Sequence, residues 1–315
     1  MMSLLLEAKN ISKSYRVKSG LLSSSENRVL DDVCFEMEAG EILAVVGESG
    51  CGKSTLARQL VMLEKPDAGE ILLDGKPLAS IRDVHKRVRM IFQNPAASLD
   101  PRKRVYQLLD EPLLNYTNLP VLEREILINE ALQHVGLNPD QSMRHPHMFS
   151  GGQRQRVAIA RAIILSPQVI VADEAVSALD VSVQAQILNL VLDLRDELGM
   201  SWLFITHDIG VVNAIADRVM VLYAGRVMES GPVAEVLASP LHPYTSMLMK
   251  SVPGTGDFDT VDSTAEAGSL DEVFGSQKTG CVFRHRCLIA DKSCAESVPP
   301  LISTASHSVA CFKAG

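Results

Sequence analysis

The stretch GESGCGKST, residues 47–55, contains the residue types that bind a nucleotide phosphate. It fits the pattern G-x-x-x-x-G-K-[ST], with Gly47, Gly52, Lys53 and Ser54 at the fixed positions. Glycines allow the tight turn that points successive backbone N–H groups at phosphate oxygens, and a following helix adds its positive N-terminal end. In such a loop the lysine reaches the β- and γ-phosphates, and the next hydroxyl binds Mg²⁺. The predicted phosphate-binding residues are Gly47, Glu48, Ser49, Gly50, Cys51, Gly52, Lys53, Ser54 and Thr55.

Polar residues at the ends of three apolar runs add the groups that phosphate hydrolysis needs. Asp173 and Glu174 follow the run VIVA, Gln93 follows RMIF, and His207 follows WLFIT. Asp173 is suited to hold Mg²⁺ through water, and Glu174 to polarise an attacking water. A glutamine beside a phosphate can ligate Mg²⁺ or orient water, and His207 is the third group expected to face the γ-phosphate. The predicted catalytic residues are Glu174, His207 and Gln93, and the predicted Mg²⁺ ligands are Ser54, Gln93 and Asp173.

A second anion site is predicted at Ser150, Gly151, Gly152 and Gln153. Serine is a natural helix N-cap, and the two glycines leave bare backbone N–H groups at the start of the next helix. The chain already has a phosphate loop, so we interpret this second helix terminus as a cap for a nucleotide held by another molecule.

The elements that must position these residues alternate between buried strands and helices. The run ILAVV before the phosphate loop is typical of a buried strand, and Leu56, Leu60 and Leu63 recur at helical spacing after the loop. Residues 4–9 and 29–37 predict strands, and the Ser- and Lys-rich stretch 17–28 between them predicts a surface loop. Residues 98–147 are helical and polar in pattern, which suggests a helical insertion.

Composition excludes several classes of protein. The chain has 315 residues, enough for one large or two unequal domains, and a net charge of −8, which argues against a nucleic-acid surface. The longest apolar region, residues 202–224, is broken by His207, Asp208, Asp217 and Arg218, so no membrane span is predicted. The N-terminal residues MMSLLLEAKN lack the pattern of a signal peptide, and we expect the chain to stay in the cytosol.

The composition changes beyond Gly231. The stretch HPYTSMLMK predicts a short helix, and residues 252–280 are rich in Gly, Ser, Thr and Asp, as in a linker. The final segment contains four of the six cysteines of the chain, Cys281, Cys287, Cys294 and Cys311, spaced C-x5-C-x6-C-x16-C.

This cysteine group predicts a structural metal site, because a segment so short cannot bury enough apolar surface to fold alone. The spacing is neither a ferredoxin nor a zinc-finger pattern, so the thiols by themselves do not decide the metal. Zinc with four thiolates, a pair of disulfides and free thiols are the alternatives to an iron–sulfur cluster, although disulfides are disfavoured in a reducing cytosol. We expect a structural or redox-sensing role, since no sequence signal links this segment to the nucleotide.

Together these motifs resemble the nucleotide-binding subunit of ATP-binding cassette (ABC) transporters. Walker A is GESGCGKST, the Q-loop residue is Gln93, the signature is FSGGQ, Walker B is VIVADE, the D-loop is SALD, and the switch histidine is His207. The resemblance makes Tyr15 the aromatic residue that stacks on adenine. It implies an α/β P-loop ATPase with a RecA-like core, an antiparallel β subdomain and a helical insertion, plus a small cysteine-containing C-terminal segment.

The stretches QNPAASLDPR, HPHMFSGGQRQR, SPLHPYTSMLMKSVP and GCVFRHRC narrow the resemblance to the ATP-binding subunits of dipeptide and oligopeptide importers, the DppF/OppF type. Importers of nickel and other small solutes share this subunit type. The implied domains are an ABC nucleotide-binding domain at 1–231 with a helical subdomain at about 95–165, a helical extension at 232–253, a flexible linker at 254–279 and a cysteine-rich segment at 280–315.

The resemblance also implies a mechanism and partners. In a head-to-tail dimer with a second ATP-binding subunit, a paralogue rather than a second copy, each ATP with Mg²⁺ would lie between one subunit's phosphate loop and the other's signature. Ser150 to Gln153 of this chain would complete the partner's site. Two integral membrane permease subunits and a solute-binding protein would complete a transporter, with this chain peripheral on the cytoplasmic face of the membrane. Residues 93–102 would form part of the groove for a permease helix, and the four cysteines would bind a 4Fe-4S cluster. A soluble ABC ATPase and a P-loop kinase are the competing classes.

Overall fold

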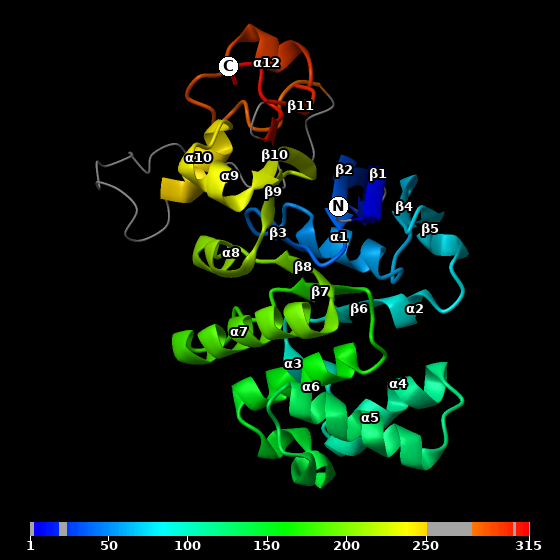
Figure 1. The fold of residues 1–315 in the computed structure, drawn as a ribbon. Helices are drawn as coiled ribbons and strands as arrows, with labels where there is room; N and C mark the ends of the chain where they lie inside the picture. The colour runs from blue at the N-terminus through cyan, green and yellow to red at the C-terminus, as the bar shows by residue number, and fades with distance from the viewer. Residues whose placement is uncertain (1–2, 19–23, 251–278, 305–306, 315) are drawn as a thin grey trace.

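A sheet of eight strands forms the centre of the protein in the computed structural model (Figure 1). The structure describes residues 3–18, 24–250, 279–304 and 307–314. The strand order is β11-β12-β10-β9-β3-β8-β7-β6. The strands are β3 (Ile42–Val46), β6 (Val88–Ile91), β7 (Val169–Asp173), β8 (Ser201–Ile205), β9 (Arg218–Tyr223), β10 (Arg226–Pro232), β11 (Ile302–Ser303) and β12 (Ser308–Val309).

The middle of this sheet is parallel. Strand β6 pairs with β7, β7 with β8, and β3 with both β8 and β9. Every residue of β3, β7 and β8 is buried. Parallel strands covered on both faces are nearly continuous apolar runs, which is why the sequence pattern identified these three strands correctly. Their carboxyl ends meet at one edge of the sheet, where the predicted polar residues follow.

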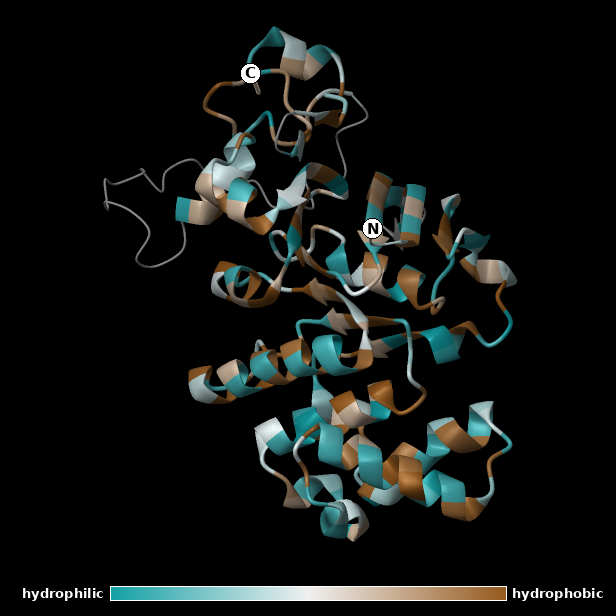
Figure 2. Cartoon of the chain, in the orientation of Figure 1, coloured by the Kyte–Doolittle hydropathy of each residue, from teal (hydrophilic) through white to brown (hydrophobic). Residues whose placement is uncertain are grey.

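Helices cover both faces of the sheet. On one face Leu43 and Val45 pack in one cluster with Leu56 of α1 (Lys53–Leu60), and on the other Trp202 packs in one cluster with Val191 of α7 (Val181–Leu198). Figure 2 shows the central strands mostly brown, whereas α7 alternates teal and brown along its length, as a helix with one face on the core should. A shorter helix, α8 (Ile209–Ile215), follows β8.

A separate antiparallel sheet has the order β2-β1-β4-β5, formed by β1 (Leu4–Lys18), β2 (Ser24–Glu38), β4 (Ala68–Leu73) and β5 (Lys76–Pro77). The predicted strands at 4–9 and 29–37 are confirmed within it. The predicted loop at 17–28 is wrong at both ends, because β1 runs to Lys18 and β2 begins at Ser24, with Arg16 paired to Glu26; residues 19–23 lie outside the described residues. Backbone hydrogen bonds hold an antiparallel pair with one face in water, so polar side chains do not prevent it.

A group of helices between β6 and β7 occupies the predicted helical insertion, at the bottom of Figure 1. They pack around Leu108, Ile128, Leu132 and Phe149, all of which are buried. The helices are α3 (Pro95–Ser98), α4 (Val105–Tyr116), α5 (Val121–His134), the short 3-10 helices η2 (Pro139–Met143) and η3 (Pro146–Met148), and α6 (Gly151–Ile163). Two small elements precede this group, η1 (Leu78–Ser80) and α2 (Val84–Arg87).

The C-terminal part packs against the far edge of the central sheet, at the top of Figure 1. It contains α9 (Val233–Ala238), α10 (Pro243–Lys250) and α12 (Lys292–Glu296), and β12 pairs with β10 so that Val309 lies opposite Glu229. The predicted linker at 254–279 lies outside the described residues except at its last position. No helix of the described residues is both long and apolar enough to cross a membrane.

Candidate active site

The phosphate loop joins β3 to α1, and two of its glycines have no room for a side chain. A Cβ on Gly47 would lie 2.1 Å from the carbonyl oxygen of Leu222, and one on Gly52, at φ +111°, would lie 2.7 Å from that of Val29. The Lys53 side chain is buried, and its Nζ donates to the carbonyl oxygens of Gly47 at 2.7 Å and Glu48 at 2.9 Å. Its ammonium group is therefore folded into the loop, where phosphate oxygens would be its stronger partners.

The predicted catalytic and Mg²⁺ residues form three contacts at the carboxyl ends of the strands. Ser54 Oγ donates to Asp173 Oδ1 at 3.2 Å. Gln93 Nε2 donates to Glu174 Oε2 at 2.7 Å, and His207 Nδ1 lies 3.5 Å from Glu174 Oε1. Neighbouring parallel strands β6, β7 and β8 end side by side, which brings together residues that lie far apart in the sequence. The structure thus brings together these five residues, while their individual roles stay predictions.

The two adjacent carboxylates of this site differ in environment. Burial raises the pKa of Asp173, while the hydrogen bond from Ser54 lowers it and the nearby charge of Glu174 raises it. Glu174 has a left-handed backbone, φ +47°, and its N–H donates to the carbonyl oxygen of Ile205 at 3.0 Å. A left-handed conformation costs a non-glycine residue about 1–2 kcal/mol, and such strain clusters at functional sites.

Tyr15 lies on β1, half-buried, and its hydroxyl donates to Glu64. The Nζ of Lys13 lies 5.7 Å from the centre of its ring. The aromatic face is thus next to a cation that also pairs with Asp67 at 2.8 Å. Stacking of Tyr15 on adenine stays a prediction.

The signature residues begin α6 as the sequence predicted. Ser150 Oγ accepts from the Gln153 N–H at 3.3 Å, and the Ser150 N–H donates to Gln153 Oε1 at 3.0 Å, which forms a capping box. A Cβ on Gly152 would lie 2.5 Å from Cγ1 of Val183, so close packing on α7 explains this glycine. Figure 1 shows α6 in the lower helical part, away from α1. A role for the signature at a second subunit's nucleotide is compatible with this separation and stays a prediction.

The four C-terminal cysteines line one small cavity together with His242 and Phe283. All four are free thiols, and burial raises the pKa of Cys281 and Cys287, as do the neighbouring cysteines. The cavity volume is about 10 Å³, roughly the space of one water molecule. Among the described residues, no group of three or more His, Cys, Asp or Glu side chains is arranged to hold a metal ion. The four thiols are of the chemical type that binds iron or zinc.

One contact joins the cysteine segment to the phosphate loop, although no sequence pattern predicts a link between them. Arg286 of that segment donates from Nη1 to both carboxylate oxygens of Glu48 in the phosphate loop, at 3.0 and 2.8 Å. The Glu48 N–H donates to the hydroxyl of Tyr244 at 2.9 Å. No local pattern pairs residues this far apart in the chain, so no sequence signal was available.

The mixed sheet, the phosphate loop and the capped signature helix define an ATP-binding cassette ATPase. Residues 30–177 match the family model described as "ABC transporter", and residues 228–294 match "Oligopeptide/dipeptide transporter, C-terminal region". A solved dimeric, post-hydrolysis ATP-binding cassette bound to ADP and phosphate is similar with a TM-score of 0.64 and 29% identity, over 73% of this chain and 99% of that one. A second, cbiO1 from Clostridium perfringens, has a TM-score of 0.66 and 30% identity, over 75% and 91%.

Curated relatives match almost the whole chain. The "Dipeptide transport ATP-binding protein DppF" of Haemophilus influenzae is 45% identical over 98% of this chain and 96% of its own, and the protein of that name from Escherichia coli is 44% identical over 98% and 94%. The "Oligopeptide transport ATP-binding protein AppF" of Bacillus subtilis is 42% identical over 98% and 96%. The chain belongs to the ABC transporter family, among the ATP-binding subunits of the dipeptide and oligopeptide type.

Proposed function

We propose that this chain hydrolyses ATP to power the import of dipeptides or oligopeptides through an ABC transporter in the cytoplasmic membrane. Identities of 42–45% to dipeptide and oligopeptide transport ATP-binding proteins support the solute class. The observation that carries the proposal is that the similarity continues beyond the cassette, through the C-terminal region at residues 228–294. The same type of subunit for another small solute, such as nickel, is the alternative.

Uptake measurements test the solute. Cells that lack this chain should lose uptake of a radiolabelled dipeptide, and a plasmid copy should restore it. A plasmid copy with Glu174→Gln should not restore it, because the proposed base is gone. Normal dipeptide uptake in the deleted cells, together with lost nickel uptake, would contradict the peptide assignment.

The proposed chemistry assigns a role to each side chain of the site. Mg²⁺ bound with ATP would be held by Ser54, Gln93 and Asp173, and it would neutralise part of the charge of the γ-phosphoryl group. Glu174 polarises the attacking water, and the hydrogen bond from Gln93 and the contact with His207 orient its carboxylate. Ser150 to Gln153 of this chain would close the phosphate site of the paired subunit, whose own signature residues would close this one.

The proposed partners are two integral membrane permease subunits, a paralogous ATP-binding subunit in a head-to-tail dimer, and a solute-binding protein. The chain would act peripherally on the cytoplasmic face of the membrane. The dimeric cassette similar to this chain supports the pairing of ATP-binding subunits. We propose the division into an ABC domain at 1–231 with a helical subdomain at about 95–165, an extension at 232–253, a linker at 254–279 and a cysteine-rich segment at 280–315.

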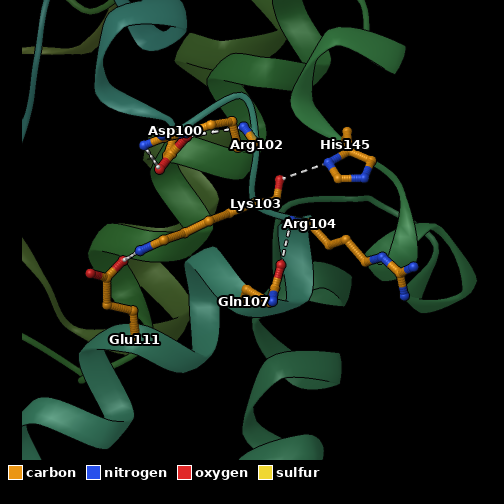
Figure 3. A network of polar contacts seen from close by, with 7 residues as sticks. All are labelled: Asp100, Arg102, Lys103, Arg104, Gln107, Glu111 and His145. Atoms are coloured by element: carbon orange, nitrogen blue, oxygen red, sulfur yellow. Dashed lines mark hydrogen bonds and ion pairs between the residues drawn. The ribbon is translucent and has the colours of Figure 1, made fainter.

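A groove beside the Q-loop is the proposed contact for a permease helix. It holds a cavity of about 260 Å³ lined in part by Phe92, Leu99 and two arginines, Arg89 and Arg161. Figure 3 shows the polar contacts that hold the adjoining segment, in which Lys103 pairs with Glu111, Arg104 with Gln107, and His145 with the Lys103 carbonyl. This network supports a docking surface that keeps its shape.

Arg102, at the edge of this surface, provides the test. Its side chain is 89% exposed and pairs only locally with Asp100, so Arg102→Ala should leave folding intact. Peptide uptake should fall while the ATPase rate of the isolated subunit stays unchanged. The matched control is Lys9→Ala, which removes another exposed cation paired with an acid two residues earlier, Glu7. Equal loss of uptake and ATPase in Arg102→Ala would count against the groove. Leu99 is 2% exposed and is a poorer test, since replacing it disturbs the core.

We propose that Cys281, Cys287, Cys294 and Cys311 bind a 4Fe-4S cluster, with zinc as the alternative. Four free thiols around one cavity support a shared ligand, and a bound metal would have to displace their protons. Protein purified without oxygen should be brown and contain about four irons and four sulfides per chain. Serine at any of the four positions should bleach it. Colourless protein with one zinc per chain would refute the cluster.

A further inference from the structure

The cysteine segment reaches the phosphate loop through one side chain. Arg286, next to Cys287, donates from Nη1 to both carboxylate oxygens of Glu48 at 3.0 and 2.8 Å. The two side chains are 25% and 29% exposed, so the pair is largely screened from water. A charge-assisted bond to two oxygens fixes the carboxylate better than a single contact does.

Aromatic rings hold the guanidinium group in place. Its central carbon lies 5.9 Å from the centre of the Tyr223 ring and 5.8 Å from that of Phe283, distances typical of cation–π contact. The rings also pack on one another, with Tyr223 and Phe283 centres 5.3 Å apart and Tyr244 4.6 Å from Tyr223. Arg286 is therefore oriented before any nucleotide binds, and its side-chain conformational entropy is lost on folding rather than on nucleotide binding.

Glu48 links this cluster to the lysine of the phosphate loop. Its N–H donates to the Tyr244 hydroxyl at 2.9 Å, while its carbonyl oxygen accepts from Lys53 Nζ at 2.9 Å. The same residue thus contacts the C-terminal part through its side chain and its N–H, and the catalytic lysine through its carbonyl. A shift of the Glu48 peptide would move the ammonium group that must meet the phosphates.

We propose that Arg286 is a positioning residue for ATP. Through Glu48 it holds the start of the phosphate loop in the conformation that presents Lys53 to the β- and γ-phosphates. The C-terminal cysteine segment is then part of the nucleotide site. This inference rests on the proposed ATPase function, and it does not depend on which metal the cysteines bind.

A double-mutant cycle tests the proposal in the assembled transporter. Arg286→Gln and Glu48→Gln should each raise the KM for MgATP about fivefold, the scale of losing one partly exposed charge pair, while kcat changes less than twofold. The KM of the double variant should be no higher than that of either single variant, because both substitutions remove the same contact. Arg286→Lys should recover part of the affinity for MgATP, since lysine keeps the positive charge but lacks the planar guanidinium group.

Arg284→Gln is the matched control, since Arg284 lies two residues before Arg286 and donates to the carbonyl oxygen of Thr279. It should leave KM unchanged. Additive effects in the double variant, an unchanged KM in Arg286→Gln, or an equal rise in Arg284→Gln would overturn the proposal. Failure of the ATPase proposal would look different, because the wild-type transporter itself would then lack ATP turnover.

Discussion

Replacing His242 with asparagine should remove an acid-induced weakening of the C-terminal part of the chain. His242 is 1% exposed, and its Nδ1 accepts from the Tyr244 N–H at 3.0 Å at the start of α10. Burial lowers the pKa of His242 to about 4. Protonation would remove this acceptor and place a charge beside the ring of Phe283, whose centre is 5.7 Å away. The titratable groups around His242 include Glu229, whose Oε2 accepts from the His242 N–H at 2.9 Å and whose Oε1 bonds His307 at 2.7 Å, and the four cysteines that line the same cavity.

The size of the effect follows from the pKa change. The unfolded imidazole binds a proton below pH 6.5, while the folded one, with a pKa of about 4, does not until lower pH. Stability from His242 is therefore fully present above pH 6.5 and is lost as the pH falls towards 4. At about 1.4 kcal/mol per pKa unit, the difference between 6.5 and 4 corresponds to about 3.5 kcal/mol in full. At pH 4 the folded imidazole is half protonated, and the opening equilibrium has changed by a factor of about 100.

Hydrogen exchange followed by mass spectrometry measures this opening. The protection factors of the α10 amides, which are normalised for the intrinsic exchange rate, should fall by about 100-fold between pH 7 and pH 4 in the wild type. Asparagine keeps an acceptor oxygen and does not titrate, so most of this fall should disappear in His242→Asn. His285→Asn, at an exposed histidine of the cysteine segment, is the control and should behave as the wild type. Parallel pH curves for His242→Asn and the wild type would refute the reasoning.

Three further substitutions test the nucleotide site. Glu174→Gln should keep ATP binding and lengthen the lifetime of the dimer. ATP turnover should drop about 100-fold, the rate contribution typical of a general base, and turnover near the wild-type rate would remove Glu174 from that role. Lys53→Ala should raise the Kd for ATP by about tenfold or more, because it withdraws a charge from the phosphates, and an unchanged Kd by fluorescence titration would contradict this. Gly152→Ala should lower the unfolding free energy by about 1–3 kcal/mol, since its Cβ would lie 2.5 Å from Val183. Gly151→Ala is the control: its Cβ would lie 3.8 Å from the nearest atom, so this variant should unfold at the wild-type denaturant concentration. Equal stability of the two alanine variants would contradict the packing argument.

The nucleotide site was predictable from the sequence because its information is local. A phosphate loop needs glycines, a lysine and a hydroxyl within nine residues, and its context is the strand before it and the helix after it. Buried parallel strands are short apolar runs, and the polar residue that ends each run lies at the same edge of the sheet. That rule places Gln93, Glu174 and His207 at one edge, whereas their direct contacts depend on the order β6-β7-β8, which the sequence pattern does not give.

Long-range packing decided the rest. The stretch at 17–28 has a loop-like composition, yet its described residues belong to the paired ends of β1 and β2. Backbone hydrogen bonds between the two strands hold them in the sheet. Likewise β12 joins the edge of β10, and the pair between Arg286 and Glu48 joins residues 238 positions apart. Neither residue has a local pattern that names its partner, because a charged side chain on a turn is compatible with many neighbours. Only the folded chain, by packing Phe283 against Tyr223 and Tyr244, brings the arginine to the phosphate loop.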